Sequence, residues 1–394
     1  MRRVTTVVAA AATALLLATP SAVAHGGKHH QPRPPEVTDL ATGLDTPLSV
    51  AAGPHGTTYV TQNFTGTITA VDRRGNTSTV HGTQPHEIFG PAEAGALSVH
   101  GRTLTFAETA ISGTEEAPVF STPIKTLRLD GHGRPVGTAR TVTDLSVYEA
   151  ERNPDGDVTY GFRETDQECL DLMPEDGMPI LYTGIVESHP YATTHAWGTT
   201  FVADAAMNAI VSVSDRGRVR AVAVLPPQPT DITAEAAASN GLPDCAVGET
   251  YWFEPVPTDV EVGPWGQLYV TTLPGGPEDP SLGARGAVYR VNPLTGSVRE
   301  VADGFFAATG LAVSPWGDIY VAELFGGRIS KVTHGEPRTL LEVGLPAAVE
   351  WHDGDLLATI EIADLAAPPD EPPPAVGRLV EIDLPKGHGH WHGR

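Results

Sequence analysis

Short runs of alternating apolar and polar residues recur along the chain, each followed by a tight turn and a second run. The clearest copies are Thr258–Val270 (TDVEVGPWGQLYV) and Thr309–Val321 (TGLAVSPWGDIYV). Alternation bounded by Gly and Pro is typical of β-strands, because successive side chains of a strand point to opposite faces of a sheet. Each copy therefore predicts two antiparallel strands joined by a Pro-Trp-Gly turn.

The same phrase occurs six times when its copies are aligned on the second strand. The aligned strands end at Tyr59-Val60, Thr105-Phe106, Phe201-Val202, Tyr269-Val270, Tyr320-Val321 and Leu357-Ala358. Each copy continues into a third apolar strand, a polar turn and a fourth strand. Repeated units of about 45 residues with this content are typical of propeller blades. The sequence therefore predicts an all-β fold, a six-bladed β-propeller with four-stranded blades.

The two ends of the repeat complete each other. The sixth unit stops after its third strand, at Leu384, whereas Val37–Leu44 precedes the first unit and has the pattern of a fourth strand. Pairing the two would close the ring and remove both open sheet edges. We therefore expect the N-terminal strand to complete the last blade, in a single propeller over residues 36–385.

Two long insertions interrupt the repeat, over about residues 143–188 and 226–257. We expect a short helix in each, one near Asp144–Asn153 and one that begins after Thr233 as its N-cap. The chain has two cysteines, Cys169 and Cys245, one in each insertion. In an exported protein such a pair favours a disulfide. The bridge would join both insertions into a cap over the third unit.

The N-terminus has the pattern of a secretory signal peptide over residues 1–24. It comprises Arg2-Arg3, the apolar run Val7–Ala18 and the small-residue site Ala22-Val23-Ala24. We expect a secreted chain without a membrane span, since no other apolar run is long enough. The mature chain carries 23 basic against 48 acidic side chains, a net charge of −25. This charge disfavours nucleic-acid partners, and we expect a monomer.

Histidines are concentrated in both tails, over residues 25–35 and 386–394. The C-terminal tail contains His388, His390 and His392. Clustered imidazoles can bind Zn²⁺, Cu²⁺ or Ni²⁺. The alternative is a disordered polar tail with weak, non-selective metal affinity.

Loop lengths distinguish the two faces of the expected propeller. Turns between first and second strands and between third and fourth strands open on one face, and they are uniformly short. We call this the plain face. The other connections open on the elaborated face, which carries both insertions, the loop Leu273–Arg285 and the Pro-rich stretch 364–374. Function concentrates in loops on a rigid scaffold, so we expect the elaborated face to bind a ligand. The alternative is that the insertions only stabilise a marginal blade.

Ionisable residues are expected at the rim of the elaborated face. At the ends of second strands these are Glu108, Asp204 and Glu323, and at the starts of first strands Glu187, His189 and Asp259. Around a central tunnel they could hold Ca²⁺ or supply acid–base chemistry. In the segment 203–208 (ADAAMN), Asp204 and Asn208 could instead hydrogen-bond turn backbone.

Other patterns offer less. Tyr251 and Trp252 lie beside Cys245 and could wall a ligand pocket or form the apolar underside of the cap. The segment 153–157 (NPDGD) has too few ligands for an EF-hand. The sequence contains no G-x-S-x-G, H-E-x-x-H or P-loop motif.

Four further segments carry a resemblance to a known family. They are Tyr182–Pro190 (YTGIVESHP), Val224–Gly248 (VLPPQPTDITAEAAASNGLPDCAVG), Thr271–Val291 (TTLPGGPEDPSLGARGAVYRV) and Val321–Gly327 (VAELFGG). The chain resembles the ScyD/ScyE family over about residues 37–384, including the insertions and both cysteines. The resemblance implies an exported, NHL-like six-bladed propeller, but no reaction and no catalytic residues. The family is named after proteins encoded beside genes for the pigment scytonemin.

Three functions are open on the sequence alone. The first is a secreted binding protein whose elaborated face takes a small molecule, a glycan or a protein. The second is a metal-dependent, lactonase-like hydrolase with Ca²⁺ at the tunnel mouth. It requires Glu108, Asp204, Asp259, Glu323 and His189 to converge on one point. The third, implied by the resemblance, is an accessory protein of secondary metabolism.

Overall fold

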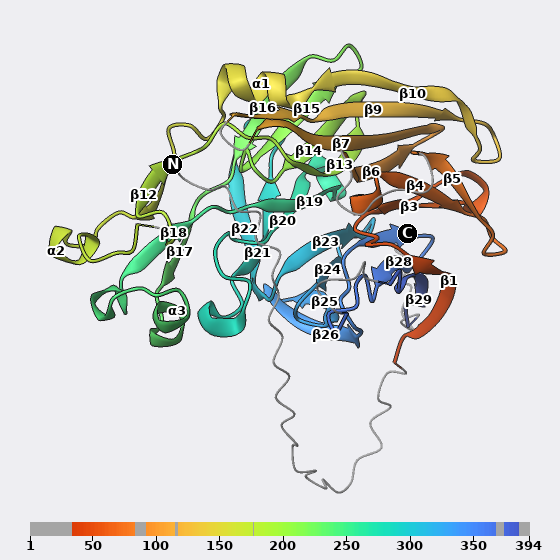
Figure 1. Cartoon of the computed structure of the whole chain (residues 1–394). Coiled ribbons are helices and arrows are strands. Elements are labelled where there is room, and N and C mark those ends of the chain that lie inside the picture. Colours follow the sequence, from red (N-terminus) through yellow and green to blue (C-terminus); the bar gives the residue numbers. More distant parts are fainter. Residues whose placement is uncertain (1–33, 83–91, 115–116, 176, 368–373, 386–394) are drawn as a thin grey trace, which may run out of the picture.

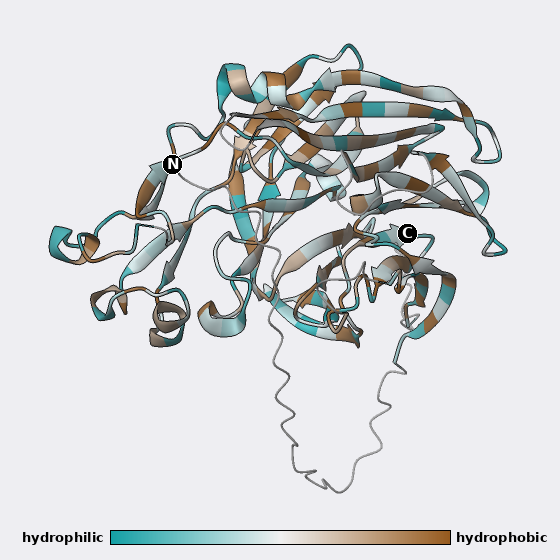
Figure 2. Cartoon of the chain, viewed as in Figure 1, coloured by the Kyte–Doolittle hydropathy of each residue, from teal (hydrophilic) through white to brown (hydrophobic). Residues whose placement is uncertain are grey.

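The computed structural model describes residues 34–82, 92–114, 117–175, 177–367 and 374–385. Within these ranges, six antiparallel sheets surround a common axis and a seventh lies outside the ring (Figure 1). The six sheets are the blades of a propeller, as the repeated phrase predicts. Apolar and polar residues alternate along many of the blade strands (Figure 2).

The strands of each blade follow one another from the axis outwards. Blade 1 consists of β2 (Val50–Ala52), β3 (Thr58–Gln62), β4 (Thr67–Val71) and β5 (Thr77–His81). Blade 2 consists of β6 (Glu93–His100), β7 (Thr103–Thr114), β9 (Pro123–Leu129) and β10 (Pro135–Asp144), with β8 (Ala117–Ser121) paired to β7. Blade 3 consists of β13 (Pro190–Ala196), β14 (Thr199–Asp204), β15 (Ala209–Ser214) and β16 (Val219–Val224).

The remaining blades repeat this order. Blade 4 consists of β19 (Pro257–Val262), β20 (Leu268–Thr272), β21 (Gly286–Val291) and β22 (Val298–Phe305). Blade 5 consists of β23 (Ala308–Val313), β24 (Ile319–Glu323), β25 (Arg328–Thr333) and β26 (Glu336–Glu342). Blade 6 consists of β27 (Val349–His352), β28 (Asp355–Ile360), β29 (Gly377–Asp383) and β1 (Glu36–Leu44). Short 3₁₀ turns are η1 (Pro54–Gly56), η2 (Asn63–Thr65), η3 (Asp244–Ala246), η4 (Pro264–Gly266) and η5 (Pro280–Leu282).

The first strands of the blades form the innermost ring. Each of β2, β6, β13, β19, β23 and β27 contacts the first strand of the next blade, and β27 contacts β2. These six strands therefore line a central tunnel. Buried aliphatic and aromatic side chains fill the space between neighbouring blades, as where Phe201 and Ile210 of blade 3 pack with Val260 and Leu268 of blade 4.

The N-terminal strand closes the ring as expected. Strand β1 pairs antiparallel with β29, with Val37 opposite Ile382 and Thr42 opposite Arg378. The last blade is therefore built from both ends of the described chain, with β1 as its outermost strand.

In two copies of the repeated phrase, the Gly before the Pro of the turn packs against the Tyr of the following strand. A Cβ atom added to Gly263 would lie 2.2 Å from the Tyr269 ring, and one added to Gly53 would lie 2.3 Å from the Tyr59 ring. The missing Cβ makes room for the buried ring of the following strand. Trp265, in the same turn, is 85% exposed, so it contributes little to this packing.

The two insertions fold together into a sheet of their own, which the sequence did not predict. Strands β11 (Thr159–Phe162) and β12 (Leu181–Thr183) come from the first insertion, and β17 (Gln228–Asp231) and β18 (Thr250–Phe253) from the second. Their order is β12-β11-β18-β17, so the central pair joins the two insertions. We call this unit the cap. Its apolar core also includes Leu282 from the long loop of blade 4, so the cap packs against that loop.

The disulfide and both expected helices are present in the insertions. Cys169 is bonded to Cys245, with a Cα–Cα distance of 5.8 Å. Helix α1 (Leu145–Arg152) begins at the N-cap Asp144, and α3 (Ala234–Ser239) at the N-cap Thr233, whose Oγ1 accepts from the Ala236 amide. The short α2 (Gln167–Leu170) holds Cys169.

In the part of the chain that the structure describes, no helix is both long enough and apolar enough to cross a membrane.

Candidate functional site

The central tunnel holds a cavity of about 100 Å³ that is lined by the first strands of the blades. Its polar lining includes Tyr191 of blade 3, Asp259 and Glu261 of blade 4, and Glu350 of blade 6. First strands run from the elaborated face towards the plain face. Asp259 therefore lies closer to the elaborated face than Glu261 does.

The three carboxyl groups of the tunnel favour their protonated forms. Burial raises the pKa of Glu261, and the charges of Glu350 and Asp259 raise it further. Burial and Asp259 likewise raise the pKa of Glu350. Burial also raises the pKa of Asp259. Its two oxygens accept from the Val260 and Leu311 amides at 2.7 and 2.6 Å, and these hydrogen bonds oppose the shift without cancelling it. The tunnel therefore holds protons, or attracts other positive charge, near neutral pH.

At the elaborated face, residues of blades 2, 3 and 4 are linked by one ion pair and by the charges that act on Tyr191. His189 Nε2 of blade 3 lies 3.4 Å from Glu93 Oε2 of blade 2. Burial lowers the pKa of His189, but Glu93, Asp204 and Glu187 outweigh burial and raise it above its ordinary value. We call Glu93, Glu187, His189, Tyr191 and Asp259 the mouth group.

Tyr191 lies within electrostatic reach of several of these groups. Burial raises the pKa of its hydroxyl, and so do the charges of Asp259, Glu278 and Glu93. Glu278 comes from the long loop between the second and third strands of blade 4. Glu187, on the loop that leads into β13, has a pKa raised first by burial, and His189 opposes that shift. The mouth group is therefore an acidic rim with a single imidazole.

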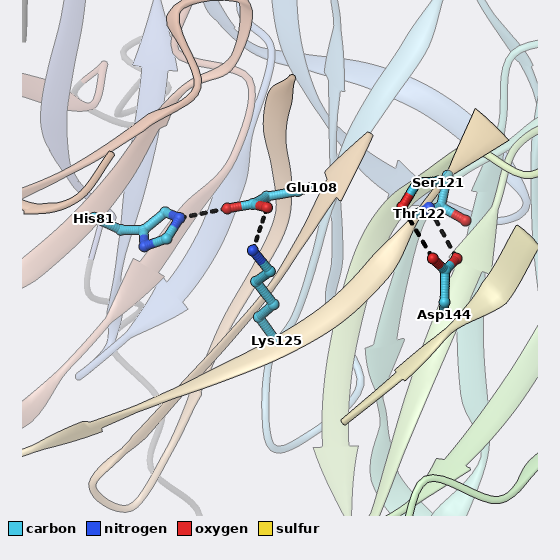
Figure 3. A network of polar contacts seen from close by, with 6 residues as sticks. All are labelled: His81, Glu108, Ser121, Thr122, Lys125 and Asp144. Carbon is cyan, nitrogen blue, oxygen red and sulfur yellow. Dashed lines mark hydrogen bonds and ion pairs between the residues drawn. The ribbon is translucent and has the colours of Figure 1, made fainter. Parts of the chain in front are cut away.

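Three expected rim residues are occupied by hydrogen bonds to nearby strands and loops. Glu108 accepts from His81 and Lys125 (Figure 3). Burial alone would raise the pKa of Glu108, but these two hydrogen bonds lower it below its ordinary value. The fully buried Glu323 accepts from Arg328 Nε at 2.7 Å and from the Phe306 amide at 2.8 Å.

Asp204 is likewise buried, and it orders the loop that carries His189. Its Oδ1 accepts from the His189 and Met207 amides at 2.7 and 3.2 Å, and its Oδ2 from Ser188 Oγ at 2.7 Å. Asn208 donates to Asp155 and accepts from the Val256 amide. Asp204 thus bonds turn backbone through the Met207 amide, whereas Asn208 bonds two other segments of the chain and not its own turn.

The five residues required by the calcium-hydrolase hypothesis do not form a metal site. Among the described residues, no three His, Cys, Asp or Glu side chains come together in a way that could hold a metal ion. Glu108, Asp204 and Glu323 instead satisfy local donors, and His189 and Asp259 remain at the mouth. The convergence that this hypothesis requires is not found, because the tunnel is lined by first strands, whereas these three carboxylates lie on second strands.

The aromatic pair near Cys245 divides between the two sides of the cap sheet. Tyr251 is buried, packs against Phe162 and Phe253, and donates to the Pro179 carbonyl at 2.9 Å. Trp252 stacks under the Arg163 guanidinium, 4.3 Å from the ring centroid. Tyr251 is therefore part of the cap core. His388, His390 and His392 lie outside the described residues.

A second candidate site, missed by the sequence reasoning, is a groove of about 790 Å³ between blades 2 and 3. It opens at the plain face and is lined by Arg102, Arg128 and Arg140. These guanidinium groups form no ion pair with any described residue. The His100 and His195 rings, also in the groove, lie 4.4 Å apart between centroids. The signal that could have found this groove is the local concentration of arginine in an acidic chain.

No protein-family model matches the sequence, and no curated protein matches it either. Solved structures match in fold. One is a protein of unknown function from Bacteroides thetaiotaomicron, with a TM-score of 0.50 and 10% identity, over 88% of this chain and 75% of that one. Another is the PQQ-bound aldose sugar dehydrogenase from Streptomyces coelicolor, with a TM-score of 0.48 and 14% identity, over 90% and 99%.

A third is the virginiamycin B lyase from Staphylococcus aureus, with a TM-score of 0.46 and 14% identity, over 89% of this chain and 99% of that one. At such identities a likeness concerns the fold alone, since one propeller fold serves many unrelated activities. The chain is therefore a β-propeller protein, and its function has to be argued from its own side chains.

Proposed function

We propose that this protein is a secreted binding protein whose ligand lies over the tunnel mouth on the elaborated face. The observation that supports the proposal is the pair formed by Glu93 and His189 across blades 2 and 3, beside Tyr191 and Asp259 of the tunnel lining. The two insertions that form the disulfide-bonded cap leave the blades at this same face, because they connect one blade to the next. Rigid strands holding polar groups beneath long loops are the usual setting for a binding site.

The size and charge of the mouth limit the ligand. A cavity of about 100 Å³ is smaller than the roughly 300–1,000 Å³ of typical small-molecule pockets. The ligand would therefore rest on the mouth and insert only an end group. Carboxyl groups that exchange protons near neutral pH can accept from or donate to hydroxyls, and when ionised they attract amines. We infer a small molecule or glycan end that presents hydroxyl or amino groups.

Secretion and family membership are part of the proposal. A disulfide between the insertions is stable in an oxidising compartment, which supports an extracytoplasmic location. Both bonded cysteines lie within the resemblance to the ScyD/ScyE family, which supports membership and an accessory role in secondary metabolism. A pulse of labelled precursor, followed by processing at Ala24 and recovery from the medium, would test export.

Glucosamine oligomers are a suitable probe because they carry both hydroxyls and amines. We expect them to bind the wild-type protein in calorimetry, and His189→Ala and Asp259→Asn to weaken the affinity about tenfold or more. His132→Ala, an exposed histidine in the β9–β10 turn of the plain face, is the matched control. Unchanged affinity in both mouth variants would remove the mouth as the site.

A second candidate function is supported by the arginine groove between blades 2 and 3. Its volume of about 790 Å³ lies within the usual ligand range, and Arg102, Arg128 and Arg140 form no ion pair with the described residues. Guanidinium groups pair well with carboxylates, so the groove fits an anionic oligosaccharide. Oligogalacturonate should bind in a salt-dependent way and lose affinity in Arg128→Ala, whereas Arg299→Ala on blade 4 should leave it unchanged.

A further inference from the structure

Two buried acids influence each other at the end of α1, within the first insertion. Glu149, in the last turns of α1, is 1% exposed, and Asp155, in the turn that follows, is 0% exposed. Asn153 lies between them as the C-cap of the helix, in a left-handed conformation with φ of 38°. Neither acid belongs to the mouth group or to the repeated blade framework.

Most side-chain oxygens of these three residues lack hydrogen-bond donors. Asp155 Oδ2 accepts from Tyr160 Oη and Asn208 Nδ2, both at 2.9 Å, but Oδ1 has no partner. Asn153 Nδ2 donates to the Gly184 carbonyl at 3.0 Å, but Oδ1 has no partner. Both carboxylate oxygens of Glu149 are buried without a partner. All the unsatisfied atoms are therefore acceptors.

Burying such atoms is unfavourable unless something positive compensates them. An unpaired buried acceptor costs about 1–3 kcal/mol, and more when it is charged. Burial raises the pKa of Glu149 to about 8, and the charges of Asp155 and Asp204 contribute. The Glu187 amide lowers that pKa slightly, but it does not reach hydrogen-bond geometry with either oxygen. No Lys or Arg is among the main influences on Glu149 or Asp155.

The backbone is shaped to bring a third segment against these oxygens. A Cβ atom added to Gly184 would lie 2.1 Å from Asp155 Oδ1 and 2.6 Å from the Asp155 carbonyl oxygen. Only glycine allows the loop before β13 to approach so closely. This loop continues to Glu187 and His189, so the buried acids and the mouth group share one connecting segment.

We propose that Glu149, Asn153 and Asp155 bind a calcium ion that fastens α1 and the turn after it to the loop carrying His189. Calcium takes carboxylate, amide and carbonyl oxygens with flexible geometry, and the available donors are all oxygens. Zinc favours imidazole and thiolate, which are missing from this set. The proposed ligand set consists of two carboxylates and one amide oxygen, so it does not require three acidic or histidine side chains around the ion.

The proposed secretion of the protein suits a site that binds extracellular calcium weakly. Extracellular calcium modules bind with Kd values of about 10⁻⁴–10⁻³ M, which two carboxylates and an amide can provide when carbonyls and water complete the shell. An ion here would also offset the negative potential that acts on Asp204, which orders the His189 backbone. The site is separate from the mouth group, so it can be present even if the proposed ligand is wrong.

The test begins with the mature wild-type protein, treated with a chelator and dialysed. Calcium titration should show one site per chain, and the melting temperature should rise by several degrees with saturating calcium. Tb³⁺, which replaces calcium, should give luminescence sensitised by Tyr160, because the hydroxyl of that residue contacts Asp155. No saturable Tb³⁺ signal and no effect of calcium on melting would overturn the proposal without any variant.

Variants then locate the site. Glu149→Gln and Asp155→Asn should each weaken calcium affinity at least tenfold. Glu151→Gln and Asp157→Asn remove exposed carboxylates from the same helix and turn, and they should leave the affinity unchanged. If Glu149→Gln instead stabilises the calcium-free protein and calcium affinity is unaltered, the two acids share a proton and the metal site is wrong. Equal losses in the exposed variants would also contradict it.

Discussion

His189 Nε2 and Glu93 Oε2 lie 3.4 Å apart, so that an imidazole of blade 3 faces a carboxylate of blade 2 across the tunnel mouth. Asp204 holds the His189 backbone amide at 2.7 Å, which fixes the loop on which the imidazole stands. The pair is partly exposed, so solvent screens it. It nevertheless makes the mouth respond to pH.

The first prediction concerns the pH dependence of His189. Its pKa in the folded protein is raised above the ordinary value of 6.5, so the protonated form is favoured by folding. The resulting stabilisation is fully present below pH 6.5 and is lost as pH rises through the folded pKa. His189→Gln should therefore reduce the free energy of unfolding at pH 5.5 but not at pH 8.5, as measured by urea titration. A loss that is equal at both values would show that the imidazole is not charged at pH 5.5.

The second prediction concerns Glu350 in the tunnel. Burial and Asp259 raise its pKa, so its contribution to stability is present below its ordinary pKa of 4.5 and is lost as pH rises through the raised value. Glu350→Gln replaces the ionisable group, so the variant does not lose this contribution to stability as pH rises. The variant should be about 1 kcal/mol more stable than wild type near pH 8 and nearly equal to it near pH 5. Glu342→Gln, on the exposed strand β26, is the control and should show no such crossover.

The third prediction concerns the disulfide of the cap. Cys169 and Cys245 are separated by 76 residues, so their bond constrains a long loop of the unfolded chain. Cys169→Ser with Cys245→Ser should lower the free energy of unfolding by about 2–4 kcal/mol. The cap should also become sensitive to proteolysis before the blades do. Simultaneous cleavage of cap and blades would show that the cap is not a separate cooperative unit.

The fourth prediction concerns Glu323, which was expected at the rim. Glu323→Ala would leave Arg328, Ser330 and the Phe306 amide without their shared acceptor. We expect a loss of about 3 kcal/mol in stability, as for other broken buried pairs. Glu336→Ala on β26 removes an exposed partner of Arg338 and should cost less than 1 kcal/mol. Near-wild-type stability of Glu323→Ala, by urea unfolding, would show that its buried network is dispensable.

Much of the fold could be predicted because its determinants are local. The alternation in Thr258–Val270 and its copies indicates the blade strands. The predicted N-terminal strand Val37–Leu44 differs from β1 by one residue at its start. Thr233 could be identified as an N-cap because its hydroxyl bonds an amide three residues on. The disulfide could be predicted from the presence of two cysteines and from the predicted export.

The rest depends on contacts between distant segments. The cap sheet could not be predicted because its central pair places Gly161 of one insertion opposite Trp252 of the other. Glu323 and Glu108 hold equivalent positions in the repeat, but that position faces the third strand of its own blade and not the tunnel. Glu149 and Asp155 look like ordinary surface acids in the sequence, since only the folded chain shows that they are buried without donors.

The most direct measurement for the binding proposal is hydrogen exchange of the protein with glucosamine oligomers and, separately, with oligogalacturonate. The proposal predicts that glucosamine oligomers slow exchange in residues 187–191 and 257–261, and that His189→Ala abolishes this protection. Protection by glucosamine oligomers confined to the arginine groove, or no protection at the mouth at saturating probe, would contradict the assignment of the elaborated face.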